Sequence, residues 1–151
     1  MPGTGDPAGL LPDAWFAPER LHDLLRDADY VVNCLPMTAT TAGMVGGAEL
    51  RAMKPTAYFV NVGRGSTVDE AALASALQQR LIAGAALDVF AQEPLPEASP
   101  LWGLDNALLS AHVSGFTPDY DERCTGLFVE NLQRYLDGRP LLNLVDRRLG
   151  Y

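Results

Sequence analysis

Cysteine is scarce in this chain of 151 residues, which contains only Cys34 and Cys124. The two form no CxxC pair, and a disulfide-stabilised scaffold needs a denser pattern of cysteines. Cys34 lies in an apolar run and Cys124 lies on the apolar side of an expected helix. Both thiols are therefore predicted to be buried, as free cysteines commonly are.

Long apolar segments are also missing. No stretch approaches the roughly 20 apolar residues that are needed to span a bilayer. The first ten residues, MPGTGDPAGL, contain neither the basic region nor the apolar region of a secretory signal peptide. We therefore expect no membrane association and a location in the reducing cytoplasm.

Positive charge is in short supply, with 11 Lys and Arg residues against 19 Asp and Glu residues and a net charge of −8. An acidic protein is repelled by phosphate backbones, so nucleic acid is not an expected partner. Neither a GxSxG nucleophile motif nor a P-loop occurs. His22 and His112 do not group with the cysteines as metal ligands would, so no metal site is expected.

What the sequence does contain is an alternation of helical and strand patterns. Buried strands are expected at residues 30–35, 57–62, 83–90 and 107–111, and helices at 18–28, 47–53, 67–81 and 117–138. The sequence TVDE at residues 67–70 has the capping-box pattern, which predicts that the third helix begins at Thr67. Strands that are apolar throughout and alternate with helices predict an α/β fold with a parallel sheet.

Polar residues follow these strands at the points where they end. Arg64 follows the second strand, Asp88 lies near the end of the third with Glu93 just beyond it, and His112 follows the fourth. Ligands of parallel α/β sheets gather at the carboxyl ends of the strands. These side chains are therefore predicted to share one site.

The residue types at this edge suit acid–base chemistry on an anionic substrate. Arg64 stands between two glycines, which let a backbone approach a ligand closely, and its guanidinium can hold a carboxylate with two parallel hydrogen bonds. Glu93 beside His112 would orient the imidazole and stabilise its charged form. Taken singly, Arg64 also fits a surface turn, Glu93 a solvated loop and His112 a structural histidine. Their convergence favours the catalytic interpretation.

Three segments, VNVGRGSTVDEAAL, AALDVFAQEPLP and SAHVSGFTPD, resemble in order and spacing the signature segments of D-isomer-specific 2-hydroxyacid dehydrogenases. This resemblance implies the second half of a Rossmann-type parallel sheet with flanking helices, plus a long C-terminal helix. It further implies NAD or NADP as cofactor, a small 2-oxo or 2-hydroxy acid as substrate, and a homodimer or other self-association. The ending LVDRRLGY resembles the short members that reduce glyoxylate or hydroxypyruvate.

The resemblance also implies a role for individual residues. Arg64 would bind the substrate carboxylate and polarise the 2-oxo group, His112 would donate a proton to the forming alkoxide, and Glu93 would hydrogen-bond His112. Asp88 would hold the nicotinamide carboxamide. The full set of implied cofactor contacts is Leu35, Pro36, Thr41, Val62, Gly63, Arg64, Asp88, His112 and Ser114.

The chain departs from the family pattern in two ways. Ala111 stands where the family usually has a proline before the catalytic histidine. The larger departure is that the N-terminal substrate domain and the GxGxxG loop are not found. GTGDPA at residues 3–8 has a similar glycine spacing, but no strand is expected before it and no adequate helix after it, so we do not interpret it as a dinucleotide-binding loop.

From these departures we expect three parts in the chain. Residues 1–16 would be a loose lead-in, 17–117 a partial dinucleotide-binding domain, and 118–151 a helix and tail that pack on an absent substrate domain. The chain is then a truncated form with little activity alone. Trp102 is expected either at an interface or in the core. The alternative function is a non-catalytic, NAD-sensing interaction protein of the same fold.

Overall fold

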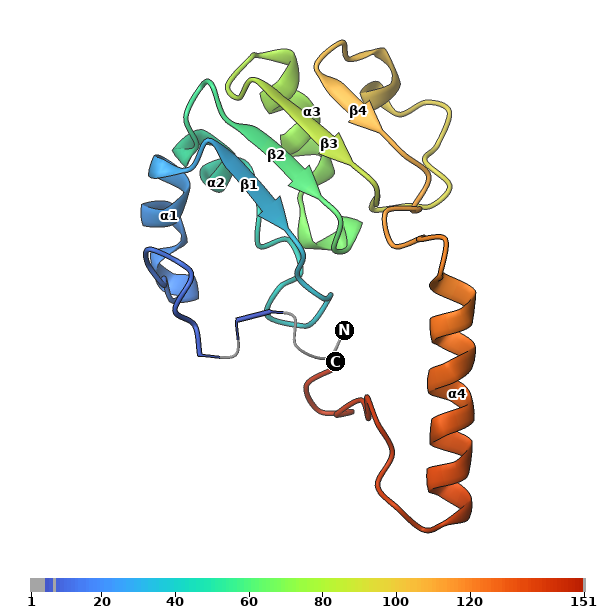
Figure 1. Ribbon diagram of the computed structural model, residues 1–151. Helices are drawn as coiled ribbons and strands as arrows, with labels where there is room; N and C mark the ends of the chain where they lie inside the picture. Colours follow the sequence, from blue (N-terminus) through green and yellow to red (C-terminus); the bar gives the residue numbers. More distant parts are fainter. Residues whose placement is uncertain (1–4, 7, 151) are drawn as a thin grey trace.

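The computed structural model describes residues 5, 6 and 8–150 (Figure 1). The expected lead-in and the GTGDPA stretch therefore lie partly outside the described residues. Four strands form one sheet in the order β1-β2-β3-β4, and all three neighbouring pairs are parallel. This confirms the predicted α/β class. The strands are β1 (Tyr30–Asn33), β2 (Tyr58–Asn61), β3 (Gly84–Leu87) and β4 (Ala107–Leu109).

Each strand is shorter than its apolar run, because the last residues of each run leave the sheet and form the loops at its carboxyl edge. The helices are α1 (Leu21–Asp27), α2 (Gly47–Ala52), α3 (Glu70–Gln78) and α4 (Tyr120–Leu136), with single 3-10 turns at η1 (Pro18–Arg20), η2 (Gly65–Thr67) and η3 (Pro100–Gly103). No helix in the described part of the chain is both long enough and apolar enough to cross a membrane.

The hydrophobic core lies between the sheet and the helices α1, α2 and α3. Leu25, Leu50, Leu73 and Leu77 project from these helices, and Phe59 of β2 faces them from the sheet; none of the five is more than 2% exposed. Burying one such side chain stabilises the fold by roughly 1.5–3 kcal/mol. Helical periodicity predicts core positions at Leu25, Leu73 and Leu77, which is confirmed. It also predicts them at Leu24 and Leu81, which is wrong, because these side chains are 37% and 36% exposed.

The other face of the sheet is open, and here the prediction of a first strand covered on both faces was wrong. Tyr30 is 71% exposed, Val32 57% and Leu108 65%. The Tyr30 and Tyr58 rings stack on this face with centroids 5.8 Å apart. In Figure 1, α2 and α3 lie behind the sheet, and no described helix lies in front of it. An apolar run predicts burial only when the elements that cover it are part of the same structure.

The long helix α4 stands apart from the sheet (Figure 1). None of its residues is buried. Its apolar side includes Phe128, Leu132, Tyr135 and Leu136, which are 49–73% exposed. The predicted burial of both cysteines was accordingly wrong, because Cys124 lies on this unpacked helix and Cys34 lies in the loop after β1; both thiols are exposed.

The start of the third helix also differs from the prediction. Helix α3 begins at Glu70, and its N-cap is Asp69, whose carboxylate accepts a hydrogen bond from the Ala72 N–H at 3.0 Å. Thr67 is instead buried in η2 and donates its hydroxyl to the Arg64 carbonyl at 2.6 Å. The capping-box pattern failed because the threonine hydroxyl is used inside the preceding loop.

Candidate active site

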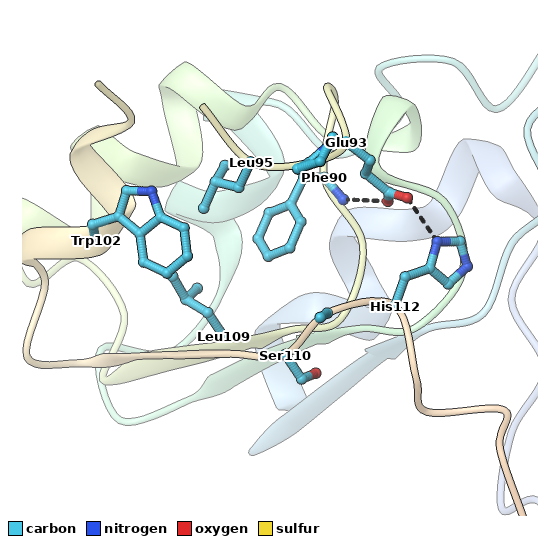
Figure 2. Close-up of a pocket in the computed structure, with 9 residues that line it drawn as sticks. Phe90, Glu93, Leu95, Trp102, Leu109, Ser110 and His112 are labelled. Atoms are coloured by element: carbon cyan, nitrogen blue, oxygen red, sulfur yellow. Dashed lines mark hydrogen bonds and ion pairs between the residues drawn. The ribbon is translucent and has the colours of Figure 1, made fainter. Parts of the chain in front are cut away.

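Arg64, Glu93 and His112 are carried by the loops that follow β2, β3 and β4, so the parallel sheet delivers all three to one edge. His112 Nδ1 lies 2.7 Å from Oε2 of Glu93 (Figure 2). The other carboxylate oxygen accepts the Phe90 N–H at 3.0 Å. The carboxylate is thus fixed by its own loop and in turn fixes the ring. With Nδ1 held, Nε2 is the ring nitrogen left to meet a ligand.

The hydrogen bonds of Glu93 stabilise its charged form. The hydrogen bond with His112, followed by that from the Phe90 N–H, holds the pKa of the Glu93 carboxyl below its ordinary value, and the positive charge of Arg64 acts in the same direction. Glu93 is therefore ionised at neutral pH and faces the imidazole as a full negative charge.

The backbone of Arg64 is fastened to the ends of β1 and β2 by buried polar side chains. Asn33 donates to Oδ1 of Asn61 at 3.1 Å and to the Thr67 hydroxyl at 2.7 Å. Asn61 and Thr67 both donate to the Arg64 carbonyl, at 3.3 and 2.6 Å. Asn33, Asn61 and Thr67 are at most 5% exposed. Neither asparagine was predicted as a site residue, although an asparagine ending each of two apolar strands was a visible signal, and Thr67 was predicted only as a helix cap.

The glycines around Arg64 serve close packing within the protein. A Cβ on Gly63 would lie 2.6 Å from the Leu35 carbonyl oxygen, and one on Gly65 would overlap the Phe90 backbone. The close approach that we expected toward a ligand is thus made to neighbouring loops. These contacts hold the Arg64 loop against the loops after β1 and β3, while Arg64 itself is exposed.

Asp88 is only 3% exposed and is hydrogen-bonded to the His112 loop. Its Oδ1 accepts the Ser110 hydroxyl at 2.6 Å and the Val113 N–H at 2.9 Å, and its Oδ2 accepts the Ser114 N–H at 2.9 Å. Burial raises the pKa of this carboxyl, but the hydrogen bonds from Ser110, Ser114 and Val113 outweigh burial and hold the pKa far below its ordinary value. A carboxylate has about four acceptor positions, so about one is left for a ligand.

The remaining predicted cofactor residues also lie in the loops at this edge. Leu35 and Val62 are 37% and 36% exposed and offer a partly open apolar surface. Pro36 is exposed beside them. The Thr41 hydroxyl donates to the Pro36 carbonyl at 2.6 Å and accepts from the Thr38 N–H at 2.8 Å, so Thr41 shapes its own loop.

An open cavity of about 520 Å³ lies beside the Glu93–His112 pair, and both of these residues are part of its lining (Figure 2). Trp102 lines its far end, is 58% exposed, and donates its indole N–H to the Pro96 carbonyl at 3.0 Å. This excludes the core position considered for Trp102. The complete lining is Phe90, Glu93, Pro94, Leu95, Trp102, Leu109, Ser110, Ala111 and His112.

The second histidine belongs to a separate pair. His22 Nε2 lies 2.9 Å from Oε1 of Glu49, which joins α1 to α2. Within the described residues, no group of three or more His, Cys, Asp or Glu side chains is placed to hold a metal ion.

Residues 12–114 match the NAD binding domain of D-isomer specific 2-hydroxyacid dehydrogenases. The glyoxylate reductase of Aeropyrum pernix is 42% identical over 129 residues, which are 85% of this chain and 38% of that protein. Glyoxylate/hydroxypyruvate reductase B of Enterobacter sp. is 43% identical over 126 residues, 83% of this chain and 39% of its own length. The chain thus spans about two fifths of the length of these relatives.

Solved structures agree with the sequence comparison. A D-isomer specific 2-hydroxyacid dehydrogenase from Xanthobacter autotrophicus in complex with NADPH and MES superimposes with a TM-score of 0.82 at 43% identity, over 88% of this chain and 54% of that one. The NADPH-dependent glyoxylate/hydroxypyruvate reductase of Sinorhizobium meliloti in complex with NADP and sulfate superimposes with a TM-score of 0.82 at 29% identity, over 90% of this chain and 44% of that one.

Proposed function

Because this chain belongs to the D-isomer specific 2-hydroxyacid dehydrogenase family, we propose that it supplies the catalytic half of a nicotinamide-dependent active site. The whole protein would transfer a hydride between NAD or NADP and a small 2-oxo or 2-hydroxy acid. The observation that carries the proposal is the 2.7 Å contact between Glu93 and His112 at the carboxyl edge of the sheet, with Arg64 on the adjacent loop.

The three side chains then have distinct tasks. Arg64 holds the substrate carboxylate and draws electron density from the 2-oxo group. His112 gives the proton at Nε2 to the oxygen that becomes the hydroxyl. Glu93, in contact with Nδ1, places a negative charge beside the ring before this proton is transferred. A positioned general acid contributes roughly 10²–10⁴-fold, and the guanidinium adds stabilisation of the developing alkoxide.

The residues present fit the nicotinamide end of such a cofactor. Asp88 keeps about one acceptor position for a carboxamide N–H, and Leu35 and Val62 offer apolar surface at the same edge. The bound cofactor supplies the hydride. The pyrophosphate of a dinucleotide rests on a glycine-rich loop at a helix N-terminus, and the sequence contains no such loop between a strand and a helix.

The names of the relatives support a proposal about the substrate. Several are named glyoxylate or glyoxylate/hydroxypyruvate reductases, and we propose these two acids as substrates.

The apolar side of α4 would pack on the substrate domain, and the open sheet face would take part in self-association. Free, exposed thiols on Cys34 and Cys124 support a reducing, cytoplasmic location.

The test is an assay of the chain alone and of the chain completed by the N-terminal part of the Aeropyrum relative, with glyoxylate or hydroxypyruvate and NADH or NADPH. We expect almost no turnover from the chain alone, because the described residues form neither a pyrophosphate site nor a closed cleft. We expect turnover from the completed protein, and a loss of at least about 100-fold in R64A and H112A.

Two results would overturn the proposal. One is turnover that survives R64A and H112A. The other is a completed protein that folds and binds the dinucleotide without reducing either acid, which would favour the non-catalytic, NAD-sensing alternative.

A further inference from the structure

Ser110 is a residue that the proposed function leaves unused, although it lies two positions before His112. Its backbone N–H donates to the Leu87 carbonyl at 2.9 Å, which continues the pairing of β3 with β4. Its hydroxyl donates to Oδ1 of Asp88 at 2.6 Å. Both the main chain and the side chain of Ser110 are thus tied to the end of β3.

Through Asp88, the hydroxyl of Ser110 is connected to the far side of the His112 loop. The same carboxylate accepts the Val113 N–H through Oδ1 and the Ser114 N–H through Oδ2. The terminal torsion of an aspartate is broad and weakly restricted by itself. A hydroxyl bond on one oxygen therefore helps to fix the plane of the carboxylate on which both backbone bonds depend.

The loop needs such a restraint because of its backbone conformation. His112 has a φ of +55°, a left-handed conformation that is uncommon for residues other than glycine and persists only when the surroundings enforce it. The preceding residue is Ala111, which lacks the ring that would fix a proline's φ. The bonds to Asp88 before and after His112 supply the restraint that the alanine does not.

We propose that Ser110 is a positioning residue for His112, acting through the Asp88 carboxylate to hold the 110–114 loop and so keep the imidazole in contact with Glu93. The value of this positioning for catalysis rests on the proposed function. The positioning itself is a property of this chain and can be measured without cofactor or substrate.

The test uses NMR on the native chain and on the variants S110A and S110T. The matched control is S75A, which removes a serine hydroxyl of helix α3 that accepts a hydrogen bond from the Gln79 side chain. The first measurement is amide exchange at Val113 and Ser114. We expect exchange to be faster by roughly tenfold or more in S110A, since a hydrogen bond to a charged group is lost. S110T keeps the hydroxyl and should stay close to the native rate.

The second measurement is the pH titration of the Glu93 carboxyl carbon. The main cause of its lowered pKa is the bond with His112, so in S110A the pKa of Glu93 should rise toward its ordinary value. The charged side chains that act on Glu93 are His112 and Arg64. A further charge, Glu70, is held close to the same loop because its carboxylate accepts the Ala91 N–H at 2.9 Å. None of these charges changes in S110A, so a shift would report the loosened contact.

The pair His22 and Glu49 is an internal control, because it is remote in the fold and its signals should not move. Native exchange rates at core amides of β2 and β3 would show that S110A is folded. The proposal is overturned if folded S110A leaves both measurements at native values, or if S75A changes them equally. Activity of the completed protein is a separate test, so either proposal can fail without the other.

Discussion

At the scale of single residues, Asp88 illustrates how a buried charge is made tolerable. An ionised carboxylate in a water-poor position is costly unless donors surround it, and Asp88 is surrounded by Ser110, Val113 and Ser114. Its expected role was to bind a cofactor carboxamide. Its observed contacts are mainly internal, and the proposed ligand would use only the remaining acceptor position.

Replacing Asp88 by asparagine should therefore be costly even without ligand. The amide nitrogen of the introduced side chain would face a backbone or hydroxyl donor, leaving buried donors unsatisfied. We expect D88N to lower the free energy of unfolding by about 2 kcal/mol or more, as measured by urea denaturation. The control is D105N at an exposed ion pair with Arg80, for which a change within about 1 kcal/mol is expected. Equal effects in the two variants would contradict this account.

The same carboxylate makes stability depend on pH. The folded-state pKa of Asp88 is depressed, so its contribution is fully present above the unfolded pKa of about 3.9 and is lost as the pH falls toward the folded value. The native chain should lose stability below about pH 4 more steeply than D88N. Parallel curves for the two proteins would argue against a strongly held carboxylate.

At the scale of elements, the sequence predicted the number, order and type of the strands because short apolar runs separated by helical periodicity are a local signal. It also placed Arg64, Glu93 and His112 at one edge, because parallel strands all end on the same side. It could not predict the exposure of Tyr30 or of Cys124, since both depend on whether other elements cover them. Nor could it locate the start of α3, because Thr67 and Asp69 are both acceptable caps and only the loop contacts decide between them.

Variants of these two residues distinguish the predicted start from the observed one. D69A should lower the free energy of unfolding by about 1 kcal/mol through loss of the N-cap. T67V should cost more, up to about 3 kcal/mol, because it removes a buried hydroxyl that both donates to Arg64 and accepts from Asn33. The control is T56V at the exposed Thr56, which should leave the free energy of unfolding almost unchanged. A neutral D69A would show that Asp69 is not the cap.

At the scale of the whole molecule, one side of the sheet is a core and the other is an uncovered apolar face. Together with the exposed apolar side of α4, this leaves two sets of apolar side chains open to solvent, and contiguous exposed apolar patches mark sites of association. Strands β1 and β4 form the two edges of the sheet, and an open edge favours pairing with another chain. The relatives are more than twice as long as the matched region, so they have additional chain that could cover such surfaces.

We therefore expect the isolated chain to associate with itself rather than remain a monomer of 16.2 kDa. The double variant V32K/L108K, which places two lysines on the open sheet face, should reduce the mass measured by light scattering at high concentration. The control L10K/L11K makes the same change of charge at residues that are 82% and 81% exposed outside the sheet. A native chain that stays at the monomer mass would refute this prediction, as would an equal effect of the control.

The buried contacts of Asn33, Asn61 and Thr67 have a mechanical consequence. They fasten the Arg64 backbone to the strand ends through groups shut off from water, so detaching this loop would leave amides without partners. The guanidinium donates one hydrogen bond, from Nη1 to the Gly63 carbonyl at 2.7 Å, whereas moving the Arg64 backbone would break both hydrogen bonds that its carbonyl accepts from buried side chains. On the function proposed above, closure around a bound acid would then be a hinge motion that brings a second rigid body toward the sheet, instead of a flap folding over the ligand.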